Sequence, residues 1–354
     1  MATVVGTWKS APRPPGATML VGPDGTAVGS VSGGCVEAAV YELGQEAIGT
    51  GTPRLVRYGV SDDDAFEVGL TCGGIIDIFV ERVDPGSFPQ LGEVAAAVEA
   101  ESPVAVATVV RDVRDRLGRR MVVWPDRVEG SLGSLHFDEA LAADARGMLA
   151  AGQTGPLTYG PDGERLGDEV AIFVASYAPP PRMLVFGAID FASALARQGA
   201  FLGYRVTVCD ARPVFATSRR FPGVEVVVDW PHRYLANEIA AGRVDGRTVV
   251  CVLTHDPKFD LPVLQLALDH DFAYVGAMGS RRTHEDRVAG LLSLGVPEEQ
   301  LKKLHSPIGL DLGARTPEET AVSITAEIIA ERWGGGGKKL STLDGSIHEN
   351  LDRR

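Results

Sequence analysis

Short apolar runs alternate with amphipathic stretches through the second half of the chain. The apolar runs have the length of β-strands and lie at residues 182–187, 205–210, 224–229, 248–254 and 272–276. Helical periodicity predicts helices over about 190–203, 232–242, 260–270, 284–294 and 317–332. Val-rich strands separated by helices indicate a parallel sheet covered on both faces. Residues 182–332 are therefore expected to form a doubly wound, Rossmann-like α/β domain.

A stiff boundary precedes this domain. Residues 179–181 are three consecutive prolines, which cannot continue a helix or a central strand and form an extended spacer. The first domain is therefore predicted over residues 1–178. At the far end, Thr316 is the expected N-cap of the last helix, and the glycine run 334–337 breaks that helix. Residues 333–354 are predicted to be a loosely attached tail.

The first domain contains an internal repeat, at about 2–80 and 107–174. The sequence Ala-Thr-Val-Val at residues 2–5 recurs at 107–110. The apolar face of a predicted helix also recurs 101 residues later, with Val36, Val40 and Ile48 corresponding to Phe137, Leu141 and Leu149. Each copy is expected to contain strands, a helix and closing strands. Two such copies should pack together as one α+β domain.

The two copies differ at two cysteine–glycine elements. The first copy has Ser-Gly-Gly-Cys at residues 32–35, where the second copy has Gly-Ser-Leu-His at 133–136. The first copy also has Cys-Gly-Gly at 72–74, where the second has Gly-Asp-Glu at 167–169. If these elements were needed only to build the fold, the second copy should need them too. The contrast favours a binding site over a role in packing.

Cys35 and Cys72 are the candidate ligand-binding and metal-binding thiols. Cys35 is predicted at the start of a helix over 36–48, where free backbone N–H groups and the helix dipole favour the thiolate, the form that binds metals. Bare glycine backbone beside each cysteine lets a bulky ligand approach, at Gly33, Gly34, Gly73 and Gly74. The alternative is that both cysteines are small core residues and the glycines form turns.

The Rossmann-like half has its own candidate residues. Gly187 opens a turn between a strand and a helix, and Asp210 ends the next strand, where a ribose-binding acid is usual. Ile189 replaces the middle glycine of the dinucleotide fingerprint, and its branched side chain should obstruct a nicotinamide dinucleotide. Further candidates follow other strands at the same sheet edge: His255, Ser280, Arg281 and Arg282. The last three suit a phosphate, although a solvated charged loop is the alternative.

Composition narrows the classes of partner. Acidic residues outnumber basic ones by 47 to 34, and the formal net charge of −13 argues against nucleic acid. No apolar run reaches the roughly 18 residues that a membrane-spanning helix needs, so no membrane partner is expected. The chain has 4 cysteines and no Cys-x-x-Cys pair, which favours a reducing compartment. We therefore expect a cytoplasmic protein.

These motifs resemble those of the XdhC/CoxI family. Gly-Ser-Val-Ser-Gly-Gly-Cys-Val-Glu at residues 29–37 and Gly-Leu-Thr-Cys-Gly-Gly at 69–74 look like its two signature segments. Residues 10–17, 275–282 and 308–314 are similar to further segments of the family. The resemblance implies an accessory factor for xanthine dehydrogenase-type and carbon monoxide dehydrogenase-type enzymes. Such factors bind the molybdenum cofactor, support its sulfuration and pass it to the apo-enzyme.

The resemblance thus implies a maturation factor rather than a turnover enzyme. Cys35 and Cys72 would bind molybdenum or relay sulfur. Molybdopterin, with or without an added nucleotide, would lie between the domains, with Ser280, Arg281 and Arg282 on its phosphate. The implied partners are an apo molybdenum hydroxylase and a cysteine desulfurase. A homodimer is one alternative for the oligomeric state. The alternatives are an NAD(P)-dependent oxidoreductase that uses the Rossmann-like domain, and a scaffold without a ligand.

Overall fold

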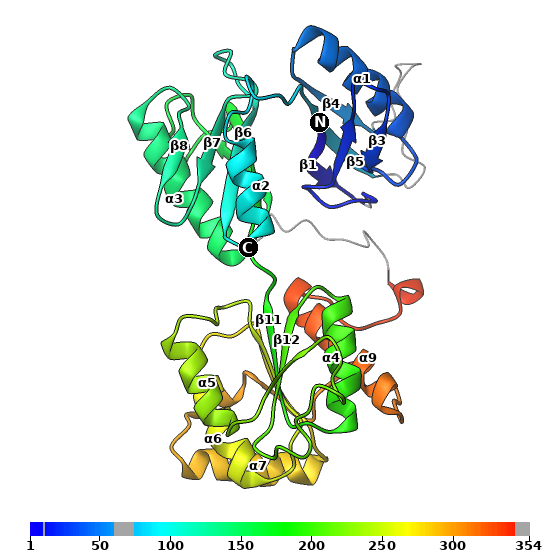
Figure 1. Cartoon of the computed structure of the whole chain (residues 1–354), viewed down its shortest axis with the longest axis vertical. Coiled ribbons are helices and arrows are strands. Elements are labelled where there is room, and N and C mark those ends of the chain that lie inside the picture. Colours follow the sequence, from blue (N-terminus) through cyan, green and yellow to red (C-terminus); the bar gives the residue numbers. More distant parts are fainter. Residues whose placement is uncertain (10, 60–73, 344–354) are drawn as a thin grey trace. The chain divides into compact units, whose positions relative to one another are not determined.

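The computed structural model describes residues 1–9, 11–59 and 74–343 (Figure 1). These residues form two compact units, Met1–Pro179 and Pro180–Thr342, and the division falls within the three-proline spacer. The first unit is α+β and the second has a parallel, Rossmann-like sheet, so the predicted fold class is confirmed. No helix among the described residues is long and apolar enough to cross a lipid bilayer.

The N-terminal unit contains two five-stranded antiparallel sheets with the same topology, which confirms the internal repeat. Their strand orders are β3-β2-β1-β5-β4 and β8-β7-β6-β10-β9. The first sheet consists of β1 (Ala2–Trp8), β2 (Thr18–Val21), β3 (Ala27–Gly29), β4 (Arg54–Tyr58) and β5 (Ile75–Val80). The second consists of β6 (Val104–Arg111), β7 (Arg120–Val123), β8 (Val128–Gly130), β9 (Gly155–Tyr159) and β10 (Val170–Tyr177). Equivalent helices, α1 (Glu37–Thr50) and α3 (Leu135–Ala151), pack on the two sheets, and α2 (Leu91–Glu99) lies in the connection between the repeats.

The two repeats contact each other through equivalent residues. The centre of the contact is one apolar cluster formed by Val5, Phe79, Val110 and Phe173. The strand register shifts at the same place in both repeats, next to Val5 and next to Val110. The flanks match as well, because Gly16 lies against Thr154 and Gly118 lies against Pro53. Use of the same surface on both sides is the mark of an isologous interface. The unit is therefore an intramolecular pseudo-dimer.

The C-terminal unit has one six-stranded parallel sheet of order β13-β12-β11-β14-β15-β16. Its strands are β11 (Arg182–Phe186), β12 (Arg205–Cys209), β13 (Glu225–Val227), β14 (Val249–Val252), β15 (Tyr274–Ala277) and β16 (Leu304–His305). Its α-helices are α4 (Asp190–Phe201), α5 (Pro231–Ala240), α6 (Pro257–Leu268), α7 (Arg281–Ser293), α8 (Glu298–Leu301) and α9 (Pro317–Trp333). Helices α4 and α9 cover one face, and α5, α6 and α7 cover the other. The strand order reverses at β11 and β14, where open α/β sheets bind ligands.

Several helices begin at positions that differ from the predicted ones. Helix α7 begins at Arg281 rather than near 284, because the Ser280 hydroxyl caps it by accepting the Thr283 N–H at 3.1 Å. Helix α6 likewise begins earlier than predicted, because the Asp256 carboxylate accepts the Lys258 N–H at 3.1 Å. Helix α8 and strand β16 were not predicted, since both are too short to show a period.

The end of the Rossmann-like unit follows the predicted signals. The Thr316 hydroxyl accepts the Glu319 N–H, and the Glu319 carboxylate accepts the Thr316 N–H, which completes a capping box. Gly334 ends α9 in the left-handed region, with a φ of 70°. The tail predicted over 333–354 overlaps α9 at its first residue, and residues 344–354 lie outside the described part of the chain.

Candidate functional site

The first turn of the repeated helix is unwound in the first repeat. In the second repeat, α3 begins at Leu135, and the Ser134 hydroxyl accepts the Phe137 N–H at 3.2 Å as an ordinary N-cap. Gly34 occupies the position 101 residues before Leu135, yet α1 begins only at Glu37. Gly33 and Gly34 have φ angles of 78° and 122°, which right-handed helices exclude. Residues 34–36 are therefore open where their counterparts are helical.

The carboxylate of Glu37 folds back into this open turn. It accepts the backbone N–H groups of Ser32, Gly33 and Gly34 at 2.9, 2.9 and 2.8 Å. It also accepts the hydroxyl groups of Ser30 and Ser32. Burial alone would raise the pKa of Glu37, but these hydrogen bonds hold the pKa well below its usual range. The carboxylate thus stays ionised and satisfies the N–H groups of the loop.

Cys35 lies in the open turn and is half-buried. Its N–H and the N–H of Val36 both donate to the Ser32 hydroxyl at 3.0 Å. The Cys35 side chain packs against the core of the first repeat. The N–H groups of residues 32–36 are not free beside the thiol, because the Ser32 hydroxyl and the Glu37 carboxylate accept them. The helix itself begins two residues further on.

The backbone beside Cys35 is bare, as the sequence suggested. Gly33 and Gly34 are both exposed, and a Cβ added to either would meet no atom within 4 Å. Such a surface admits a bulky ligand close to the chain. The second element lies mostly outside the described residues, which include neither Cys72 nor Gly73. Gly74 is buried directly before β5. The convergence of the two cysteine elements stays a prediction.

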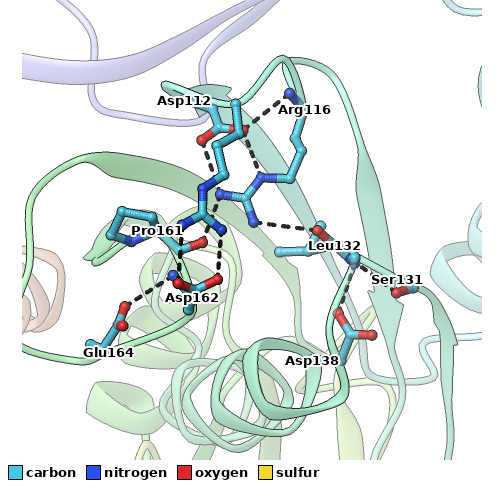
Figure 2. Close-up of polar contacts among 10 residues, drawn as sticks. Asp112, Arg116, Ser131, Leu132, Asp138, Pro161, Asp162 and Glu164 are labelled. Carbon is cyan, nitrogen blue, oxygen red and sulfur yellow. Dashed lines mark hydrogen bonds and ion pairs between the residues drawn. The ribbon is translucent and has the colours of Figure 1, made fainter.

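In the second repeat, the Arg116 side chain connects the segments that lie around the start of α3 (Figure 2). The Arg116 guanidinium is paired with Asp112 at 2.7 Å and donates to the Pro161 carbonyl at 3.0 Å. A weaker bond of 3.4 Å reaches the Leu132 carbonyl. Arg116 also lies 5.2 Å from the centre of the Phe137 ring and is only 8% exposed. This repeat has no cysteine at the start of its helix, and Ser134 and Leu135 stand at the positions of Gly33 and Gly34.

In the Rossmann-like unit, Gly187 and Asp210 connect neighbouring strands. A Cβ on Gly187, whose φ is 108°, would lie 3.0 Å from the Thr254 nitrogen, so only glycine fits there. The Asp210 carboxylate is 2% exposed and accepts the Ala188 N–H at 2.8 Å. Arg212 donates to the same carboxylate through its backbone and guanidinium at 2.8–2.9 Å. Asp210 thus fixes the loop after β11.

The remaining candidates follow β14 and β15 at the same sheet edge. His255 is exposed directly after β14, and Ser280 caps α7. Arg281 and Arg282 are exposed in the first turn of α7. The topology therefore brings these residues to the carboxyl edge that also carries Gly187 and Asp210. Within the described part of the chain, no group of three or more His, Cys, Asp or Glu side chains is placed to hold a metal ion.

A buried ion pair beneath this edge was not predicted. Arg287 of α7 donates to Asp260 of α6 at 3.0 Å and to the Met278 carbonyl at 2.8 Å. It also donates to the Ser306 hydroxyl at 2.9 Å. The Thr254 hydroxyl donates to the other oxygen of Asp260. One guanidinium therefore ties together the segments that follow β14, β15 and β16.

Family models match most of both units. The model described as the XdhC Rossmann domain matches residues 183–328. The model described as the XdhC and CoxI family matches residues 1–59 and 97–160. The chain belongs to the XdhC and CoxI family. The resemblance drawn from the cysteine–glycine segments is confirmed.

Relatives of this family member are similar over nearly the whole chain. A Bacillus subtilis protein named as a probable xanthine dehydrogenase subunit is 28% identical, over 94% of this chain and 92% of the relative. The molybdenum cofactor insertion chaperone PaoD of Escherichia coli is also 28% identical, over 94% of this chain and 83% of PaoD. A crystal structure described as a xanthine dehydrogenase from Bacillus halodurans matches with a TM-score of 0.68 at 26% identity, covering 97% and 93% of the two chains.

Sequence reasoning missed Glu37 and Ser32 as determinants of this site. Both stand in the family segment at residues 29–37, and the repeat pairs Glu37 with the shorter Asp138. The signal was a longer carboxylate two residues after the cysteine, which itself directly follows two glycines. Its meaning depends on the positive φ angles at those glycines, which a sequence pattern does not reveal.

Asp210 gives a testable pH dependence. Burial alone would raise its pKa, but hydrogen bonds from Arg212 and from the Ala188 N–H lower it below the usual range. A lowered folded-state pKa contributes stability above the unfolded pKa of about 3.9, and this is lost as the pH falls through the folded-state value. We expect Asp210→Asn to destabilise the Rossmann-like unit by about 1–3 kcal/mol at pH 7 and by less at pH 3. Hydrogen exchange of the β11 and β12 amides measures this, and an equal deficit at both pH values would contradict it.

Proposed function

We propose that this chain is an accessory protein that binds the molybdenum cofactor. It supports sulfuration of the cofactor and its insertion into a xanthine dehydrogenase-type or carbon monoxide dehydrogenase-type molybdenum hydroxylase. The observation that carries the proposal is similarity over 94% of the chain to a protein named as a molybdenum cofactor insertion chaperone. Family membership of both units supports the same role.

The local structure of the first repeat supports a ligand site there. The two repeats share one topology, but only the first has an open turn with a thiol and exposed bare backbone. Gly33 and Gly34 leave room for a large ligand, and the Cys35 sulfur is a soft donor suited to molybdenum or to sulfur transfer. We propose Cys35 and Cys72 as the thiol contacts, with the glycines beside them as the surface the ligand approaches.

The Rossmann-like unit would contribute polar groups at its carboxyl edge. Arg281 and Arg282 are exposed beside the capped start of α7 and suit a phosphate, with Ser280 between them and β15. Gly187 and His255 lie at the same edge, and Asp210 holds the loop after Gly187 in place through the Ala188 N–H. The further partners to be tested are a cysteine desulfurase as the sulfur source, the apo-hydroxylase as the recipient, and a second copy of the chain.

An NAD(P)-dependent oxidoreductase is the competing function, because the strand order is that of dinucleotide-binding folds. Asp210 argues against the standard binding mode, since a ribose hydroxyl would have to displace Arg212 or the Ala188 N–H from a carboxylate that is almost fully buried. Ile189 argues against it too, because it stands where close approach of a pyrophosphate needs glycine. Titration with NAD and NADP should therefore show no tight binding.

Cofactor retention by the full-length protein tests the proposed function. The protein is mixed with isolated molybdenum cofactor and gel-filtered, and retained pterin is measured by fluorescence after oxidation. We expect the parent protein to retain the pterin. Cys35→Ala should lose at least about tenfold in affinity, because even the loss of a residue that only hydrogen-bonds a metal ligand has an effect of this size. Cys251→Ala removes a thiol buried in the Rossmann-like sheet and should bind as the parent does.

Two results would count against the proposal in different ways. Failure of the parent protein to retain any pterin would overturn the function. Retention by the parent together with equal retention by folded Cys35→Ala would leave the function in place but remove Cys35 from the site. Circular dichroism of each variant confirms that the fold is intact.

A further inference from the structure

The open turn before α1 is an unfavourable structure that something must hold. Residues 34–36 forgo the helical conformation that their counterparts adopt at the start of α3. Gly33 and Gly34 also lose more backbone entropy on ordering than other residues would. Glycine adopts these φ angles without strain but also adopts many others, so one ordered open conformation persists only where neighbouring groups hold it. The second repeat shows that the scaffold does not require the open turn, because α3 starts at Leu135 with a serine cap.

The group that fixes the turn is the Glu37 carboxylate. It accepts five hydrogen bonds, three from backbone N–H groups and two from serine hydroxyls. Hydrogen bonds to an ionised acceptor are roughly twice as strong as neutral ones. Ser32 extends this restraint to the backbone of Cys35 and Val36. Its hydroxyl donates to Glu37 and accepts the N–H groups of Cys35 and Val36. Glu37 therefore controls the backbone of Cys35 through one intermediate side chain.

Asp138 provides a comparison inside the same molecule. It stands 101 residues after Glu37 and accepts the Leu132 N–H at 2.7 Å (Figure 2). No other hydrogen bond reaches its carboxylate from the residues that the structure describes. Gly133 instead donates its N–H to the Ser131 hydroxyl at 3.1 Å. The shorter carboxylate accompanies a closed helical turn, and the longer one accompanies the open turn that carries the thiol.

We propose that Glu37 is the positioning residue of the first-repeat site: its carboxylate holds residues 32–36 open, so that Cys35 and the bare backbone of Gly33 and Gly34 face the ligand. The proposal rests on the proposed function for the identity of that ligand, the molybdenum cofactor. Glu37 acts through the loop rather than by contact with the ligand. The N–H groups of residues 32–36 are already bonded, so this loop supplies a thiol and contact surface rather than an anion hole. The phosphate of the ligand must be bound elsewhere.

The test compares Glu37→Gln with Asp138→Asn in the full-length protein, with Glu37→Asp as the conservative variant. Each variant removes or shortens one carboxylate at equivalent positions of the two repeats. Three quantities are measured: hydrogen exchange of the amides of residues 32–36, alkylation of Cys35 by iodoacetamide as read by peptide mass spectrometry, and retention of isolated molybdenum cofactor. The first two do not depend on the cofactor.

In Glu37→Gln we expect the amides of residues 32–34 to exchange at least about tenfold faster than in the parent protein, because they lose an ionised acceptor. Alkylation of Cys35 should also be faster, because its backbone is held less firmly. Cofactor affinity should fall about tenfold or more, as for loss of an outer group that orients a metal ligand. Glu37→Asp should lie between Glu37→Gln and the parent, because it keeps the charge but reaches fewer donors. Asp138→Asn should leave all three measurements at the parent values.

The outcomes separate this proposal from the proposed function. Parent-like exchange and alkylation in Glu37→Gln would show that Glu37 does not hold the loop and would overturn the proposal. Faster exchange with undiminished cofactor affinity would also overturn it while leaving cofactor binding established. If the parent itself retains no cofactor, the proposed function fails, and exchange and alkylation alone then decide whether Glu37 positions Cys35. If Glu37→Gln does not fold, Glu37→Asp carries the same three comparisons.

Discussion

Replacing Arg287 by methionine should lower the unfolding free energy of the Rossmann-like unit by about 3–5 kcal/mol. Arg287 and Asp260 are 4% and 3% exposed and form an ion pair at 3.0 Å. The variant leaves the Asp260 carboxylate in the interior, with the Thr254 hydroxyl as its remaining partner. It also leaves the Met278 carbonyl and the Ser306 hydroxyl without their donor. A buried charge that loses its partner is among the most destabilising of single changes.

Denaturant-dependent hydrogen exchange of β14 and β15 in the full-length protein measures this loss. Arg282→Met is the matched control, because it removes an exposed arginine from the same helix and should change stability by no more than about 0.5 kcal/mol. Adding Asp260→Leu to Arg287→Met should recover part of the loss, since no unpaired charge then remains. Equal effects of Arg287→Met and Arg282→Met would show that the ion pair does not brace this edge.

The fold class was predictable because burial of a strand or helix itself requires the apolar pattern that indicates it. Strands covered on both faces are apolar at nearly every position, so the runs at 182–187 and 248–254 were recognisable in the sequence and correspond to β11 and β14. Helix starts were less predictable. Ser280 and Asp256 stand before the periodic apolar pattern, and their effect comes from a hydrogen bond to one backbone N–H. The capping geometry, rather than the hydrophobic pattern, sets these boundaries.

The candidate site was located through the internal repeat rather than through a motif alone. Two copies of one scaffold act as each other's control, and only the first copy has Gly33, Gly34 and Cys35. What remained hidden was the conformation before the helix, because the apolar pattern predicted a helix from residue 36 but carried no information on the φ angles of Gly33 and Gly34. Arg287 was hidden for a related reason. A charged residue in an amphipathic helix normally faces solvent, and only the fold shows that this one faces Asp260.

Phe79→Ala and Phe173→Ala should destabilise the N-terminal unit by similar amounts, about 3–5 kcal/mol each. The two rings are 2% and 3% exposed and belong to the cluster that joins the repeats. They occupy equivalent positions in β5 and β10 of the two sheets, so each truncation opens the same kind of cavity. The near-equality is the specific expectation, because an isologous contact has no preferred side.

Urea unfolding of the full-length protein, read from exchange of the β5 and β10 amides, gives the two values. Leu20→Ala, which truncates an exposed side chain of β2, should change stability by no more than about 0.5 kcal/mol. The double variant should cost less than the sum of the single ones, because both rings line one cluster and the second truncation enlarges an existing cavity. A large loss for one phenylalanine with none for the other would mean that the repeats share a topology but not an interface. The two repeats would then not be equivalent scaffolds. In that case the start of α3 would no longer be a valid comparison for the open turn at Cys35.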